Sequence, residues 1–178
     1  CYALQYMTGL RELELNSSED HLLVPHLLLL LQGQCCAGLE SLYIGPKSSI
    51  TSQQLSGLVS RCPQLNTLYS IHVNCISEAV LVELARSCPH LQKVTLDSSG
   101  KVTEEGVLAL VAHCRQLREI ILPDNTLAEE TVRQLAQHCR YLVKVNMIEY
   151  VREGEVMVVR YKHYSRKEIR ALRETVRQ

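Results

Sequence analysis

A cysteine that returns at almost constant intervals is the feature that most limits what this chain can fold into. Successive members of the set lie 26, 26, 26 and 25 residues apart, and a leucine follows each of them three residues later. The members are Cys36, Cys62, Cys88, Cys114 and Cys139. A fixed period of roughly 20 to 50 residues is typical of repeat proteins, in which each unit buries its apolar face against its neighbours. The sequence therefore predicts an array of stacked units.

Each unit contains two apolar periods. After the cysteine, residues such as Val94 and Leu96 alternate with polar ones, as in a strand with one buried face. The copy after Cys62 departs from this pattern, because Ser70 takes the last apolar position. Before each cysteine the spacing is helical, and a residue eleven positions earlier is placed to cap the helix. These positions hold Thr51, Ser77, Thr103 and Ala128, so we expect side-chain caps on the first three helices only.

A strand and a helix in every unit predict an α/β fold, a right-handed horseshoe solenoid with parallel strands on its concave face and helices on its convex face. We expect residues 1–148 to form this array, with about six repeats, and residues 149–178 to form a strand-and-helix cap. A turn is expected at 152–154, and Ser165 and Glu168 resemble a capping box that opens a final helix. Net positive charge in this last region leaves a partner-binding tail as the alternative to a cap.

Composition excludes several classes of function. The 178 residues include 19 basic and 19 acidic side chains, so no overall charge recruits nucleic acid. The longest apolar stretch, 22–31, contains Pro25 and His26, is too short to span a bilayer, and is expected to form a buried helix. Nothing in the sequence resembles a signal peptide. The chain begins at Cys1 and not at Met, so a fragment that has lost its leader is the alternative. We expect a monomer in the cytoplasm or nucleus, without contact to a membrane.

The repeated cysteines raise the question of metal or redox chemistry. One thiol per repeat spreads the ligands along the array, whereas structural zinc needs four that converge. Buried, reduced thiols that pack as small apolar groups fit the pattern better. The pairs His113-Cys114 and His138-Cys139 recur in register, so we interpret them as helix ends rather than as a nucleophile and its base. No hydrolase, metalloprotease or phosphate-loop motif is present, and we expect no enzyme, no metal and no cofactor.

The segment from Val102 to Leu122, with Cys114 at its centre, resembles the cysteine-containing repeat of F-box/leucine-rich-repeat proteins. The segment from Ile76 to Leu96 resembles the same repeat. The resemblance implies a substrate-binding domain for a cullin-type (SCF) ubiquitin ligase. It also implies a ligase adaptor and a cullin as partners, held through an F-box that is not in these 178 residues. A leucine-rich-repeat scaffold or inhibitor unconnected with ubiquitin is the alternative.

The strand face that points away from the core is the candidate binding surface. Its middle column is expected to hold Glu14, Tyr43, Tyr69, Thr95, Ile121 and Asn146. One flanking column is expected to hold Glu12, Ser41, Thr67, Lys93, Glu119 and Lys144, and the other Asn16, Gly45, Ile71, Asp97, Pro123 and Ile148. From these columns the predicted protein-binding residues are Tyr43, Tyr69, Ile71, Lys93, Thr95, Glu119, Ile121 and Asn146. An aromatic and aliphatic patch with a charged rim favours protein binding. Scattered surface apolar residues are the alternative.

Overall fold

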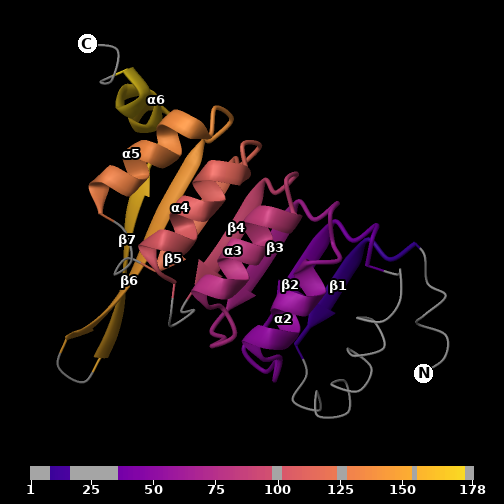
Figure 1. Cartoon of the computed structure of the whole chain (residues 1–178). Coiled ribbons are helices and arrows are strands. Elements are labelled where there is room, and N and C mark those ends of the chain that lie inside the picture. Colours follow the sequence, from indigo (N-terminus) through magenta and orange to yellow (C-terminus); the bar gives the residue numbers. More distant parts are fainter. Residues whose placement is uncertain (1–8, 17–35, 98–101, 124–127, 154–155, 175–178) are drawn as a thin grey trace.

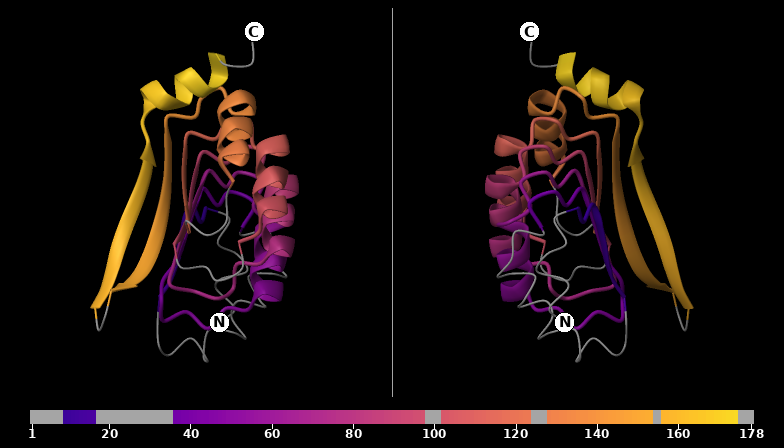
Figure 2. Two further views of the ribbon diagram at one scale, coloured as in Figure 1. Left: turned by 90° about the vertical axis from the view of Figure 1, so that its left-hand side faces the viewer. Right: turned by 90° about the vertical axis from the view of Figure 1, so that its right-hand side faces the viewer.

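The structure is a computed structural model that describes residues 9–16, 36–97, 102–123, 128–153 and 156–174. Within these residues the chain is an α/β fold in two layers, with one sheet and a row of helices along one of its faces (Figures 1 and 2). The apolar stretch 22–31, predicted to be a buried helix, lies outside the described residues. None of the described helices is long and apolar enough to cross a lipid bilayer.

The described residues form seven strands of the sheet, which lie side by side in chain order. The first six are parallel: β1 (Glu12–Leu15), β2 (Ser41–Ile44), β3 (Thr67–Ile71), β4 (Lys93–Asp97), β5 (Glu119–Pro123) and β6 (Lys144–Glu153). The last strand, β7 (Val156–Tyr164), is antiparallel to β6. Residues one repeat apart are directly opposite each other, as Leu68, Val94 and Ile120 are. The repeat period in the sequence is therefore the step from one strand to the next, which confirms the predicted parallel α/β arrangement.

Four helices connect successive strands and cover one face of the sheet (Figure 2). They are α2 (Ser52–Val59), α3 (Glu78–Ser87), α4 (Glu104–His113) and α5 (Glu129–His138). The predicted caps at Thr51 and Thr103 are confirmed, since each hydroxyl accepts from the backbone N–H three residues later at 3.2 Å. The predicted side-chain cap at Ser77 is wrong. Helix α3 begins there without it, because the carbonyl of Ser77 accepts from Leu81 N at 3.1 Å and Glu78 places a negative charge in the first turn.

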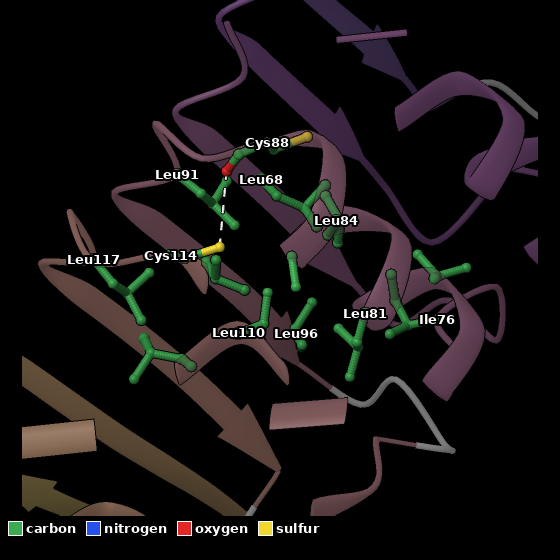
Figure 3. Close-up of a cluster of buried hydrophobic side chains, with 14 of the residues drawn as sticks. Leu68, Ile76, Leu81, Leu84, Cys88, Leu91, Leu96, Leu110, Cys114 and Leu117 are labelled. Atoms are coloured by element: carbon green, nitrogen blue, oxygen red, sulfur yellow. Dashed lines mark hydrogen bonds between the residues drawn. The ribbon is translucent and has the colours of Figure 1, made fainter. Parts of the chain in front are cut away.

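The core lies between the sheet and the helices and consists almost entirely of leucine, valine, isoleucine and cysteine. Leu84 and Leu110 reach it from helices, and Leu91 and Leu117 reach it from the segments before β4 and β5 (Figure 3). All four side chains are fully buried. Ser70 is also fully buried, and its hydroxyl has no hydrogen-bond partner among the described residues. The interruption noted in the sequence is thus a polar atom inside an apolar layer.

The repeated cysteines form a ladder through this core. The thiols of Cys88 and Cys114 each donate to a carbonyl of the preceding repeat. Cys88 Sγ lies 3.4 Å from Cys62 O. Cys114 Sγ lies 3.7 Å from Cys88 O (Figure 3). Cys139 Sγ continues the series at 3.7 Å from Cys114 O. Loss of solvent around the thiolate raises the pKa of Cys88 and of Cys114 from 9.0 to about 12. The predicted burial of these cysteines is confirmed, and none of the five forms a disulfide within the described residues.

Cys88 and Cys114 should resist alkylation in the native protein at pH 8 and react fully after unfolding, because the thiolate is the nucleophile and burial suppresses it. Their raised pKa values also predict a stability that falls as pH rises above 9, where the unfolded chain loses these protons and the folded chain keeps them. Mass spectrometry of labelled peptides and urea unfolding at several pH values measure the two effects. Rapid native labelling of both thiols would contradict the buried ladder.

The C-terminal region ends the array with a hairpin and a helix that do not follow the repeat pattern. Strand β6 continues to Glu153 and pairs with β7 in a long hairpin, so the predicted boundary at 148/149 falls inside a strand. Figure 2 shows this hairpin curving away from the helix layer. Helix α6 (Arg166–Glu174) follows and packs against α5. Its predicted capping box is confirmed, since Ser165 N donates to Glu168 Oε2 at 2.8 Å and Glu168 N donates to Ser165 Oγ at 3.4 Å.

Candidate binding face

The second face of the sheet, which we call the open face, carries the predicted middle column and the predicted flanking column from Glu12 to Lys144 in the predicted order. Along the middle column, Glu14 is opposite Tyr43, Tyr43 is opposite Tyr69, and Tyr69 is opposite Thr95. The column continues through Ile121 to Asn146. The flanking column from Glu12 to Lys144 is also in register across all six parallel strands. The alternation in each strand sends these side chains away from the buried leucines.

Tyr43 and Tyr69 form the aromatic centre of the open face. Their ring centroids are 5.9 Å apart and the rings are tilted by 50°, within the range in which aromatic pairs attract each other. Tyr69 is 40% exposed, which is large for an aromatic side chain of this size. Ile71 lies two residues further along β3, on the same face, and is half-buried. The three side chains form a contiguous apolar surface beside polar neighbours.

A pocket of about 500 Å³ opens at this end of the face. Its lining includes both tyrosines, Ile71 and three polar residues of the first strand segment, namely Glu12, Glu14 and Asn16. Gly45 shapes it, because a Cβ at that position would collide with the side chain of Asn16, whose own Cβ would be only 2.8 Å away. A glycine here lets Asn16 lie against β2. The sequence placed Gly45 and Asn16 in one column but gave no sign of this close approach.

Further along the face the apolar and charged residues are more mixed. Thr95 and Ile121 are half-buried and continue the middle column. In the flanking column, Glu119 lies between Lys93 and Lys144, so its carboxylate has a lysine on each neighbouring strand. Opposite charges on adjacent strands attract each other modestly at a solvent-exposed site. This part of the open face is therefore close to neutral.

Asn146, a predicted binding residue of the middle column, is half-buried and contacts the last strand. Its Oδ1 lies 2.5 Å from Nδ1 of His163, which is directly opposite it on β7. The sequence does not indicate this contact, because His163 lies on a strand after residue 148 that does not belong to the repeat. Ile148, expected in a flanking column, is buried rather than open to solvent. On β7 the most exposed apolar side chain is Tyr161, which the register places beside Ile148.

The histidines that precede two of the cysteines act at helix ends. His113 Nδ1 is 3.0 Å from Ala109 O, and His138 Nδ1 is 3.0 Å from Gln134 O. Both rings are exposed and contact the last turn of their own helix, as predicted from their recurrence. Among the described residues, no group of three or more His, Cys, Asp or Glu side chains is placed to hold a metal ion.

Comparison with known proteins adds no relative. No protein-family profile matches this sequence, and no curated protein matches it. The properties of the open face therefore have to be argued from its own residues.

Proposed function

We propose that this chain is a leucine-rich-repeat solenoid that binds another protein through its open face, which would be the concave side. The observation that carries the proposal is the contiguous surface of Tyr43, Tyr69 and Ile71, flanked by charged and polar columns. Exposed aromatic side chains at the centre of a patch and polar groups at its rim are the usual composition of a protein-binding surface. Within the part of the chain that the structure describes, no comparable convergence of reactive side chains favours an enzyme.

The arrangement of the strands supports the solenoid part of this proposal. Six parallel strands follow one another in chain order, and residues one repeat apart are paired. Each of the helices α2 to α5 links two adjacent strands on the same side of the sheet. Such arrays bind partners on an extended surface because every repeat contributes one row of side chains to it.

The resemblance of the repeats to F-box/leucine-rich-repeat proteins supports a narrower proposal: substrate recognition for a cullin-type ubiquitin ligase. The bound protein would be the substrate, and a region outside this sequence would hold the adaptor and the cullin. Co-precipitation from cells of the protein at its native length tests this. Recovery of the adaptor and the cullin is the expected result. Recovery of a partner without them would favour the scaffold or inhibitor instead.

The binding surface is tested by replacing Tyr43 and Tyr69 together with alanine. We expect at least a tenfold loss of captured partner from a cell lysate, since a buried interface aromatic can contribute about 2 kcal/mol. Tyr141→Ala is a matched control, because Tyr141 is 43% exposed against 40% for Tyr69 but lies in the turn before β6. Charge reversal at Lys93 or Glu119 should change mainly the association rate and its salt dependence.

Circular dichroism of each variant shows whether the fold is retained. If the Tyr43/Tyr69 double variant is folded and recovers the same partners as the wild type, while Tyr141→Ala loses them, the binding surface lies at the edge of the sheet and the proposal is wrong.

A further inference from the structure

The pocket over β1, β2 and β3 indicates what chemistry the partner offers, if the open face binds a protein as proposed above. We propose that this pocket takes an arginine side chain from a basic segment of the partner. The inference combines three observations: two carboxylates that face no cationic residue on β2, an exposed tyrosine pair, and a cavity that joins them. The side chains that would contact the guanidinium are Glu12, Glu14, Tyr43 and Tyr69.

The carboxylates of β1 belong to one face of one strand. Glu12 and Glu14 are two residues apart, so their side chains project in the same direction, and both are exposed. On the adjacent strand the register places Ser41 opposite Glu12 and Tyr43 opposite Glu14. Within the described part of the chain, no ion pair involves either carboxylate. The negative charge of Glu12 and Glu14 is therefore available to a ligand.

The other glutamate of the same column shows the contrast. Glu119 has Lys93 on one neighbouring strand and Lys144 on the other, at the strand spacing of about 4.8 Å. Glu119 thus faces a lysine on each side, whereas Glu12 and Glu14 face Ser41 and Tyr43 on β2. A cationic group that approaches the open face is consequently attracted to the β1 end rather than to the centre.

The tyrosine pair selects among cations. A cation within about 6 Å of a tyrosine ring face is attracted by the ring, and the planar guanidinium group can also stack on it. The same group donates two parallel hydrogen bonds to a carboxylate, which an ammonium group cannot do. With the rings of Tyr43 and Tyr69 on one side and the carboxylate of Glu14 in the next strand, the pocket offers both interactions at once. Its volume of about 500 Å³ also leaves room for part of the backbone that carries the arginine.

Two short glycine–serine peptides test this inference. One has a central arginine and the other has citrulline, which keeps the shape of arginine and removes its charge. Titration into isotope-labelled protein, followed by the NMR shifts of the Gly45 and Ile71 amides, should show saturable binding of the arginine peptide. The citrulline peptide should bind at least tenfold more weakly. Equal shifts with both peptides, or no saturable shift with the arginine peptide in the millimolar range, would overturn the inference.

Charge variants separate the pocket from the overall charge of the protein. Glu12→Gln combined with Glu14→Gln should weaken the arginine peptide at least tenfold and should reduce capture of the native partner. Glu105→Gln combined with Glu129→Gln is the matched control, because it removes two exposed carboxylates from the first turns of α4 and α5, on the helix side of the sheet, and it should change neither result. An equal loss in the control would mean that general charge, and not this pocket, determines binding.

The same variants distinguish failure of this inference from failure of the proposed function. If the Tyr43/Tyr69 double variant loses the native partner and the Glu12/Glu14 double variant keeps it, the open face binds a protein but does not use a basic anchor. If both double variants keep the partner, the open face is not the binding surface and the proposed function is wrong as well.

Discussion

Leu110→Ala is expected to lower the free energy of unfolding by about 2–5 kcal/mol. Leu110 lies in the middle of α4 with no exposed surface, and it is surrounded by core side chains from this repeat and the one before it (Figure 3). Alanine removes the buried methyl groups and leaves a cavity that a close-packed array cannot fully close. Because each repeat is held by its neighbours, damage at this central position should unfold a large part of the chain.

Urea unfolding followed by circular dichroism measures this loss. Val82→Ala is the control, because Val82 lies on α3 but is 45% exposed, and a surface change of this kind alters stability by about 0.5 kcal/mol or less. Leu84, Leu91 and Leu117 should behave like Leu110. A change within experimental error at two of these four leucines would mean that the assignment of helix and strand faces is wrong.

Arg173→Met is expected to cost about 2–3 kcal/mol, although the residue lies near the end of the chain. The guanidinium of Arg173 donates to three carbonyls at the end of α5 and in the following turn. Its Nη2 lies 2.8 Å from Cys139 O and 3.1 Å from Leu142 O, and its Nε lies 2.5 Å from Ala136 O. Methionine keeps most of the aliphatic stem but leaves these acceptors without their charged donor, and each such bond contributes about 1.5–3 kcal/mol at most.

The matched control for Arg173 is Arg170→Met on the same helix. Arg170 pairs with Glu174 four residues later and both side chains are largely exposed, so its loss should change stability by about 0.5 kcal/mol or less. Thermal or urea unfolding of both variants gives the comparison. Equal stability of the two variants would show that α6 does not hold the last repeat through Arg173.

The sequence by itself determined the repeat period, and with it the register of the sheet. A cysteine and a leucine that return every 26 residues place each strand beside the next one, so the column from Tyr43 to Ile121 follows from counting. The faces follow from the alternation of apolar and polar residues, which is a local property of each strand. For the same reason the Tyr43–Tyr69 contact was predictable before any coordinates were known.

Only the tertiary structure decided how the array ends and where the predicted pattern is modified. The pairing of β7 with β6 brings His163 to Asn146, and the packing of α6 on α5 brings Arg173 to carbonyls more than thirty residues earlier. Both contacts join segments that do not belong to the repeat, so no period in the sequence specifies them. The missing side-chain cap at Ser77 has a related cause: a serine at a cap position permits that hydrogen bond, but the conformation of the finished turn decides whether it forms. Repetition makes local geometry readable from the sequence, whereas the contacts that break the repetition depend on how distant segments pack.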